Sequence, residues 1–365
     1  FVHGHEKLAA IKKYGFPADK LLFAGVLDGR NVWKADLIAI DTVLAALREA
    51  VASDNIVISP SCSLLHCPLS LEYEDGLPEV LRGYLAFADE KIAELVEIAR
   101  LYRFNDNDRI EKLKQRQQEF RDAPERIDAE IRLEATRCEL RRNHYRKPVA
   151  SRLKLQQQQL QLPLFPTTTI GSFPQTADVR KVRHDFKTGL IDAAVYHNFI
   201  RAKIAELIAL QEDIGLDVLV HGEYERNDMV EFFGEKLQGF CFTANGWVQS
   251  FGTRCVKPPI IWADVRRTAP LTVEETVYAQ SLTAKPVKGM LTGPVTILNW
   301  SFVRNDISRA EVCAQLAIAI REEVADLERN GIRIIQIDEP AFREGVPLRQ
   351  EKQPLYYRWA VNGFQ

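Results

Sequence analysis

The chain has 365 residues, with 48 Lys and Arg against 50 Asp and Glu, and a formal net charge of -2. Its 46% hydrophobic and 27% charged residues are ordinary for a globular protein, and the length allows two domains or one large α/β barrel with an appendage. The balanced charge gives no signal for nucleic acid or a membrane, and no apolar run approaches the roughly 18 residues of a membrane span. Six cysteines without a CxxC pair favour a reducing compartment, so we expect a cytoplasmic protein.

The first part of the chain alternates between predicted strands and helices. Residues 21–27 and 55–59 are short apolar segments typical of strands, and residues 37–52 have helical periodicity. A longer helix is predicted over residues 79–101, where apolar residues recur at three- and four-residue spacing. This order indicates two units of a strand followed by a helix.

From residue 105 to residue 160 the composition shifts to Arg, Lys, Glu and Gln, which predicts a charged helical connector. Its basic stretch at residues 137–147 is interleaved with acids and predicts a solvated helix face. A nucleic-acid role for this face is the alternative, although the stretch lacks the interleaved aromatic residues of a stacking platform.

Beyond residue 165 the alternation of strand and helix begins again. Ser308 and Glu311 predict a capping box at the start of one helix, and Gly215 predicts the end of another. Repeated alternation of this kind predicts a parallel α/β sheet, and specifically a (βα)8 barrel of the TIM type. The predicted strands are residues 167–170, 217–220, 286–291 and 332–337, and the predicted helices are residues 200–214 and 309–329.

The most informative stretch is residues 331–340, where an isoleucine-rich segment ends in Asp338 and Glu339. A short β-branched run bounded by Gly331 and Pro340 predicts a strand buried on both faces. Active-site groups gather at the carboxyl ends of parallel strands, so these two acids are candidates for ligand binding. The alternative is that a carboxylate here caps the next helix.

Polar residues also follow three other predicted strands, namely Ser172, Glu223 and Thr292. In a barrel these side chains would converge with Asp338. The carboxylates of Glu223 and Asp338 would hold an ammonium group, while backbone N–H groups near Gly171 and Ser172 would receive a carboxylate. This combination suits an α-amino acid.

Two tryptophans, Trp247 and Trp300, lie in predicted loops after strands, and Arg254 and Cys255 form a dipeptide near the first of them. An aromatic plane with Arg and carboxylates nearby fits a flat heterocycle such as a pterin. Core packing is the alternative for each tryptophan taken alone.

Metal and nucleophile chemistry has weaker support. No base is evident beside Cys255, so we expect a binding or structural thiol there. The chain contains neither GxGxxG after a strand nor GxxxxGK[ST], which disfavours Rossmann and P-loop chemistry. Two sets carry metal-binding side chains at unspecific spacing, namely His221, Glu223 and Glu225, and Cys62, His66 and Cys67.

Eight motifs in order give the chain a specific resemblance to a known family. The second half contains FPTTTIGSFP, VHGE, RNDM, VKPP, GMLTGP and IDEP, and the first half contains DGRNVW and SCSLLH. With these motifs the chain resembles the cobalamin-independent methionine synthases.

The resemblance implies methyl transfer from 5-methyltetrahydropteroyltri-L-glutamate to L-homocysteine, with zinc and without cobalamin, in two (βα)8 barrels. Residues 1–104 would then be the end of an N-terminal barrel, residues 105–164 the helical connector, and residues 165–365 the first strands of the catalytic C-terminal barrel. The complete enzyme is expected to be a monomer that needs neither nucleic acid nor a membrane.

The resemblance also implies roles for individual residues. The zinc ligands and the catalytic histidine of the family would follow Gln365, so we expect no metal ligand and no catalytic residue in this chain, and no turnover by the chain alone. The alternatives are a non-catalytic amino-acid-binding fragment and another methyltransferase or decarboxylase barrel of the same wider group. The homocysteine or methionine site would contain Ile170, Gly171, Ser172, Glu223 and Asp338, and the folate site Arg254, Cys255, Trp300 and Glu344.

Overall fold

The computed structural model describes residues 5–140, 147–250 and 252–364. The chain divides into two compact units. The first unit consists of Phe1–Asp128, Phe240–Ala263 and Ser301–Ile307, and the second of Ala129–Gly239, Asp264–Trp300 and Ser308–Gln365. Each unit is therefore built from three separate stretches of sequence.

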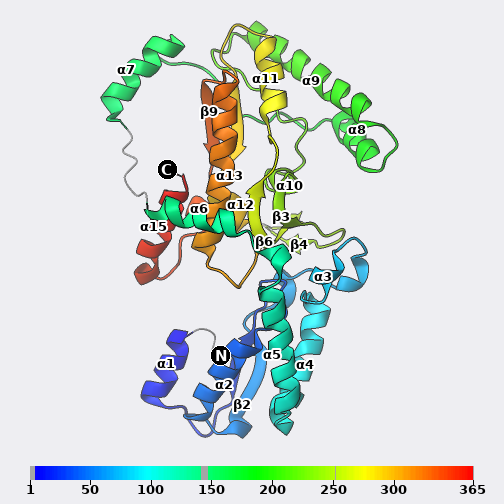
Figure 1. Cartoon of the computed structure of the whole chain (residues 1–365), viewed down its shortest axis with the longest axis vertical. Coiled ribbons are helices and arrows are strands. Elements are labelled where there is room, and N and C mark those ends of the chain that lie inside the picture. Colours follow the sequence, from blue (N-terminus) through cyan, green and yellow to red (C-terminus); the bar gives the residue numbers. More distant parts are fainter. Residues whose placement is uncertain (1–4, 141–146, 251, 365) are drawn as a thin grey trace. The chain divides into compact units, whose positions relative to one another are not determined.

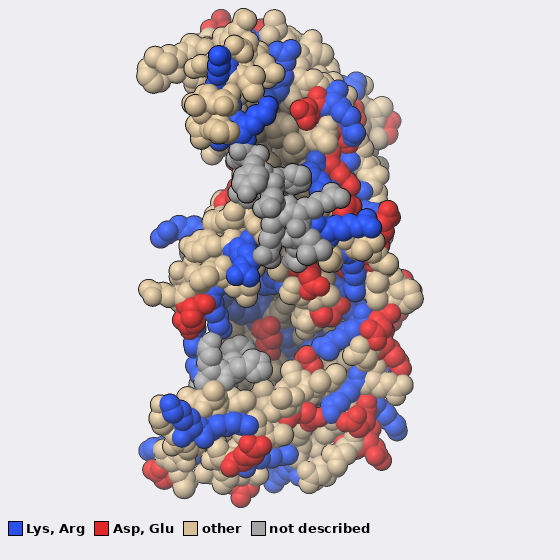
Figure 2. Space-filling model, turned by 60° about the vertical axis from the view of Figure 1, so that its left-hand side comes forward, with Lys and Arg blue, Asp and Glu red and all other residues tan. Residues whose placement is uncertain are grey.

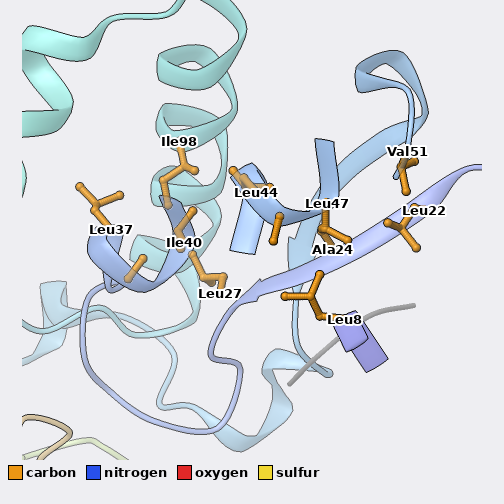
Figure 3. Packing of buried hydrophobic residues seen from close by; sticks show 12 residues of the cluster. Leu8, Leu22, Ala24, Leu27, Leu37, Ile40, Leu44, Leu47, Val51 and Ile98 are labelled. Carbon is orange, nitrogen blue, oxygen red and sulfur yellow. The ribbon is translucent and has the colours of Figure 1, made fainter. Parts of the chain in front are cut away.

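The first unit contains a parallel two-stranded sheet of β1 (Leu22–Leu27) and β2 (Ile56–Pro60). Both strands were predicted. Residues on one face of β1 pack against α2 (Leu37–Arg48) and are fully or almost fully buried, as Figure 3 shows for Leu22 and Ala24. These residues belong to the apolar core between the β1–β2 sheet and α2. Burial of one leucine side chain in such a core contributes about 2 kcal/mol to the free energy of unfolding.

The prediction of one continuous helix over residues 79–101 is wrong, because the structure has two helices there. These are α3 (Glu79–Arg82) and α4 (Ala88–Phe104). In the segment between them Leu85 forms an antiparallel bridge with Trp33, so the backbone there bonds to another strand-like segment instead of continuing a helix. Apolar spacing cannot reveal such a long-range partner.

Arg126 joins all three stretches of the first unit. Its guanidinium is 2% exposed and donates to the carbonyl oxygen of Trp262 at 2.8 Å, to Asp306 Oδ1 at 3.0 Å and to the carbonyl oxygen of Phe120 at 3.2 Å. The same guanidinium lies 4.1 Å from the centre of the Phe120 ring. A buried charge is tolerated only when it is paired and hydrogen-bonded, and Arg126 meets both conditions.

The remaining elements of the first unit are two helices, several 3-10 turns and three two-residue strands. They are α1 (His5–Tyr14), α5 (Asn107–Arg121), η1 (Ser53–Asn55), η2 (Leu64–His66), η3 (Leu71–Tyr73), η4 (Pro124–Arg126), β4 (Val248–Gln249), β5 (Cys255–Val256) and β8 (Phe302–Val303). Strands β3 (Leu237–Cys241) and β6 (Ile260–Arg267) run through the points where the chain passes between units, and the three-stranded sheet has the order β3-β6-β8.

The second unit contains the parallel pair β7 (Lys288–Thr292) and β9 (Ile334–Asp338), next to the long helix α13 (Arg309–Arg329) (Figure 1). The register runs from Lys288↔Ile334 to Thr292↔Asp338. The other elements are α6 (Ala129–Leu140), α7 (Val149–Leu160), α8 (Ala177–Lys187), α9 (Ala193–Ile214), α10 (Glu231–Glu235), α11 (Val273–Ser281), α12 (Pro294–Asn299), α14 (Ala341–Glu344), η5 (Gln350–Lys352) and α15 (Gln353–Phe364).

The predicted helix ends in this unit are confirmed. Ser308 Oγ accepts a hydrogen bond from the Glu311 N–H at 3.2 Å, and Glu311 Oε2 accepts one from the Ser308 N–H at 2.8 Å. Gly215 ends α9 with a φ of +87°, a left-handed conformation that glycine adopts without steric cost.

Three strand predictions need correction. Residues 167–170 and 217–220 form no regular strand, and only the isolated parallel bridges Ser172↔Gly222 and Leu219↔Val287 occur near them. Positive φ angles at Gly171 and Gly222 take the backbone out of the β region and interrupt the ladder. Strand β9 is half-buried along its whole length, whereas burial on both faces was expected, because β7 is its only partner strand among the described residues.

The predicted α/β class is confirmed, and the charged stretch from residue 105 to residue 160 is helical as expected. Helix α5 belongs to the first unit and helices α6 and α7 to the second. Most of the basic stretch at residues 137–147 lies outside the described residues. On the face shown in Figure 2, Lys and Arg side chains are interspersed with Asp and Glu side chains. None of the helices in the described ranges has the length and apolar composition needed to cross a bilayer.

Glu323 provides a test of the packing in the second unit. Its carboxylate is fully buried and accepts hydrogen bonds from the N–H of Leu271 at 2.8 Å, the N–H of Thr272 at 2.6 Å and Arg267 Nε at 2.9 Å. We predict that Glu323→Gln lowers the free energy of unfolding by about 3 kcal/mol, because an amide cannot accept from all these donors or balance the guanidinium charge.

Urea denaturation followed by circular dichroism measures this loss. Glu328→Gln on the same helix is the matched control, since Glu328 is exposed and should change the stability by less than about 0.5 kcal/mol. Equal, small effects of the two substitutions would contradict the prediction.

Candidate functional site

The segment from Ile170 to Ser172 lies against Glu223. Ser172 forms a parallel bridge with Gly222, and the side chain of the next residue, Glu223, reaches toward Gly171. Gly171 has a φ of +136°, and a Cβ atom at this position would lie 2.8 Å from Glu223 Oε1 and 2.4 Å from Met290 Cε. Only glycine therefore fits here, and its absent side chain allows the carboxylate to approach the backbone.

The backbone of Glu223 has an unusual conformation. Its φ of +58° is disfavoured for a residue with a side chain, and such conformations persist only where the surroundings impose them. The carbonyl oxygen of Glu223 accepts hydrogen bonds from the N–H of Arg226 at 3.1 Å and from Gln175 Nε2 at 3.2 Å, which hold the turn. Arg226 Nη1 lies 3.7 Å from Glu223 Oε1 and contributes a positive charge behind the carboxylate.

Asp338 borders the same segment from β9. Gln336 Nε2 donates to Asp338 Oδ1 at 2.7 Å and to the carbonyl oxygen of Ile170 at 3.1 Å. Residues 336 and 338 share a face of β9 because side chains of a strand alternate with a period of two. The structure thus brings together the predicted residues of the amino-acid site, namely Ile170, Gly171, Ser172, Glu223 and Asp338.

Glu339 has a different position from its neighbour. Its Oε1 accepts from the N–H of Val295 at 2.9 Å, and its Oε2 accepts from the N–H and the hydroxyl of Thr296, both at 2.7 Å. Burial raises the pKa of Glu339, while these hydrogen bonds act against that rise. The alternative that a carboxylate here caps the next helix is therefore wrong about the helix, because Glu339 caps the preceding helix α12. Thr292, also a strand-end candidate, donates to the carbonyl oxygen of Met229 at 2.8 Å.

His221 and Glu225 form a buried polar pair. Glu225 Oε1 lies 3.1 Å from His221 Nε2 and accepts from Arg226 Nε at 2.8 Å. Burial alone would raise the pKa of Glu225, but His221 and Arg226 outweigh this effect and lower it. Both contacts use Oε1, whereas Glu225 Oε2 and His221 Nδ1 are buried without a hydrogen-bond partner among the described residues.

The two sets with metal-binding side chains gain no support. In the ranges that the structure describes, no three or more His, Cys, Asp and Glu side chains are grouped so that they could hold a metal ion. Cys67 Sγ lies 3.1 Å from the carbonyl oxygen of Gly29, to which the thiol donates.

The predicted folate residues fall into two pairs, one in each unit. Trp300 follows α12 and its Nε1 donates to Glu344 Oε2 of α14 at 3.0 Å, so these two lie together in the second unit. Cys255 is the first residue of β5 in the β4–β5 hairpin of the first unit, Arg254 directly precedes it, and both are exposed. Trp247 is 55% exposed in the same unit, with Lys257 Nζ 5.9 Å from its ring centre.

Sequence reasoning missed Lys288 and Gln336. Lys288 Nζ donates to Gln336 Oε1 at 2.8 Å and to the carbonyl oxygen of Thr169 at 2.9 Å. A signal was present in the sequence, because each is a polar residue within a largely apolar predicted strand. Such residues are rarely buried without a partner.

The cysteines allow a test of the local environments. Burial raises the pKa of Cys67 to about 11, so at pH 8 only about one molecule in a thousand carries its thiolate, the reactive form. Since Cys255 is exposed, we predict that iodoacetamide labels it well before Cys67 in the folded chain. Peptide mass spectrometry over time measures both rates, and labelling in urea, where the two should react alike, is the control. Equal rates in the folded chain would contradict the described burial of Cys67.

Two family models match the chain. Residues 165–365 match the model described as "Cobalamin-independent synthase, Catalytic domain", and residues 1–52 match "Cobalamin-independent synthase, N-terminal domain". The first match covers more than half of the chain and includes the candidate amino-acid site.

Relatives match over the whole chain. The chain is 50% identical over 372 residues to a 5-methyltetrahydropteroyltriglutamate--homocysteine methyltransferase of Bacillus mycoides, and 51% identical over 370 residues to that of Bacillus thuringiensis (strain Al Hakam). Each alignment covers 100% of this chain and 48% of the relative, so the chain spans about half the length of the relatives it matches.

A solved structure, the B12-independent methionine synthase from Shewanella sp. W3-18-1, is 25% identical with a TM-score of 0.47, over 55% of this chain and 58% of that chain. Because this TM-score is low, the assignment depends on the family models and on the sequence relatives. These show that the chain belongs to the cobalamin-independent methionine synthase family.

Proposed function

We propose that this chain contributes the amino-acid-binding part of a methyltransferase. The enzyme would transfer a methyl group from 5-methyltetrahydropteroyltri-L-glutamate to L-homocysteine and give methionine. The names of the relatives support these substrates. The observation that carries the proposal is that Glu223 Oε1 lies against Gly171, while Gln336 Nε2 donates both to the Ile170 carbonyl oxygen and to the Asp338 carboxylate.

The chemistry of this arrangement fits an α-amino acid. An ammonium group is bound best by ionised acceptors, which Glu223 and Asp338 supply from two different strand ends. The substrate carboxylate would be received at Ser172, which is exposed and carries a hydroxyl group. Arg226 behind Glu223 and Gln336 beside Asp338 would fix the two acids before the ligand arrives.

For the fold we propose the (βα)8 barrel of the family, with residues 1–104, 105–164 and 165–365 as barrel end, connector and first part of the catalytic barrel. Parallel neighbours at Ser172↔Gly222 and Lys288↔Ile334 support it, whereas the direct bridge Leu219↔Val287 departs from the barrel order. In a closed barrel strands follow one another in chain order, so β6 would lie between residue 219 and β7; here it pairs with β3 and β8. Completion of the barrel would therefore require β6 to change partners.

For the folate we propose that Trp300 in the second unit offers an aromatic plane held by Glu344. The support is the Trp300–Glu344 hydrogen bond together with the family resemblance. Arg254 and Cys255 in the first unit are proposed as folate-binding residues on the family resemblance alone. We also propose a monomeric complete enzyme in the cytoplasm, without cobalamin and without nucleic-acid or membrane partners.

Zinc, which the family resemblance implies, does not fit the described residues. No suitable group of His, Cys, Asp and Glu side chains occurs among them, and Glu225 already engages His221 Nε2. We therefore propose that this chain alone binds no catalytic zinc and does not turn over substrate. A non-catalytic amino-acid-binding protein is the second candidate function, which the assembled acid pair favours. The 50% identity to the methyltransferases argues against another barrel of the wider group.

Substitution of the two adjacent acids tests the amino-acid site. We predict that Asp338→Asn weakens binding of L-methionine at least about tenfold without a loss of stability, because it removes the charge that faces the ammonium group. Glu339→Gln should instead lower the stability by about 1 kcal/mol and leave the affinity within about twofold, since it weakens the cap of α12.

Isothermal titration calorimetry and urea denaturation measure the two effects. The two substitutions serve as controls for each other, because they are adjacent and make the same chemical change. Unaltered binding by Asp338→Asn would contradict the proposed role of that carboxylate.

A zinc measurement tests the other part of the proposal. After incubation with zinc and desalting, we expect far less than one zinc per chain by plasma emission spectrometry. A content near one zinc per chain would show that this chain has a metal site of its own.

A further inference from the structure

We propose that Lys288 and Gln336 are positioning residues that make the site select ligands with an ammonium group. They would do so by holding the Asp338 carboxylate in one orientation. This inference rests on the proposed function, in which Asp338 receives the ammonium group of an amino acid.

A chain of hydrogen bonds links the three side chains. Lys288 Nζ donates to Gln336 Oε1 at 2.8 Å, and Gln336 Nε2 donates to Asp338 Oδ1 at 2.7 Å. Both donors are also fixed to the backbone, since Lys288 Nζ donates to Thr169 and Gln336 Nε2 to Ile170, at 2.9 and 3.1 Å. The chain therefore connects β7, β9 and the segment that borders the candidate site.

Lys288 determines which way the Gln336 amide points. A lysine ammonium group can only donate, so the atom of Gln336 next to it must be the amide oxygen. The amide nitrogen then faces Asp338 and must donate to the carboxylate. The Ile170 carbonyl oxygen, which also accepts from Gln336 Nε2, favours the same orientation, and Lys288 adds the partner that holds the amide oxygen away from the carboxylate.

The position of the lysine matters as much as its charge. Lys288 is only 6% exposed, and its ammonium group forms no ion pair with Asp338 within the part of the chain that the structure describes. A direct ion pair would neutralise Asp338 and compete with the ligand. With Gln336 in between, Asp338 Oδ1 is occupied by a neutral donor, and Oδ2 has no hydrogen bond to any described residue.

The Asp338 carboxylate, held in one orientation by Gln336, should bind a ligand with an ammonium group more tightly than a ligand without this group. A group that is already held in its binding orientation loses less conformational entropy when the ligand arrives. A purely structural role for Lys288 and Gln336 would stabilise the site equally for both kinds of ligand. The preference between the two ligands therefore separates a positioning role from a structural one.

The test compares L-methionine with its analogue that lacks the amino group, by isothermal titration calorimetry with the full chain. We expect the wild-type chain to prefer L-methionine, and Gln336→Met and Lys288→Met each to reduce this preference about tenfold. The affinity for the analogue should stay within about twofold. Gln336→Asn, which keeps an amide but is too short to bridge both partners, should give the same loss if Gln336→Met does not fold.

Lys285→Met is the matched control. Lys285 Nζ also donates to a backbone carbonyl oxygen, that of Leu216 at 2.6 Å, but it has no contact with Gln336 in the described structure. This variant should keep the wild-type preference. If the Lys288 and Gln336 variants lose affinity for both ligands equally, the positioning role is overturned while the proposed function stands. If the wild-type chain shows no preference for L-methionine, the proposed function itself is overturned, and this inference with it.

Discussion

The candidate site depends on the register between β7 and β9. This register places Thr292 opposite Asp338 and Met290 opposite Gln336, and it brings Lys288 within reach of Gln336. A shift of one residue would turn Gln336 and Asp338 to the other face of the strand and bring Glu339 into the place of Asp338. The acid that we propose to face the ligand and the acid that caps α12 would then exchange positions. Both the proposed chemistry and the packing of α12 thus follow from one set of backbone hydrogen bonds.

The identity of the two acids shows how far sequence reasoning extends. An isoleucine-rich strand that ends in Asp338 and Glu339 was predictable from composition and spacing, and so was the importance of the strand end. Alternation along a strand implies that adjacent acids point to opposite sides, but it does not say which side holds the ligand. That choice depends on Val295 and Thr296, whose N–H groups donate to Glu339 as a cap, and these lie more than forty residues earlier.

The incorrect predictions of secondary structure also result from features that apolar spacing does not reveal. The break between α3 and α4 results from hydrogen bonding to residues 32–34, and the missing strands near Ser172 and Leu219 result from backbone angles at glycines and at Glu223. Apolar spacing reports burial of one face and contains no information about such partners. Local signals with a local cause, such as the Ser308 capping box and the Gly215 helix end, were predicted correctly.

The cap on α12 has a consequence for the ligands that this strand end can receive. The first turn of a helix attracts anions, because its N–H groups are unpaired and its dipole is positive there. In this protein Glu339 already accepts hydrogen bonds from the N–H groups of Val295 and Thr296. An acidic ligand group would meet a helix end whose N–H groups are already occupied by a carboxylate, so its counter-charge would have to come from Lys or Arg side chains elsewhere.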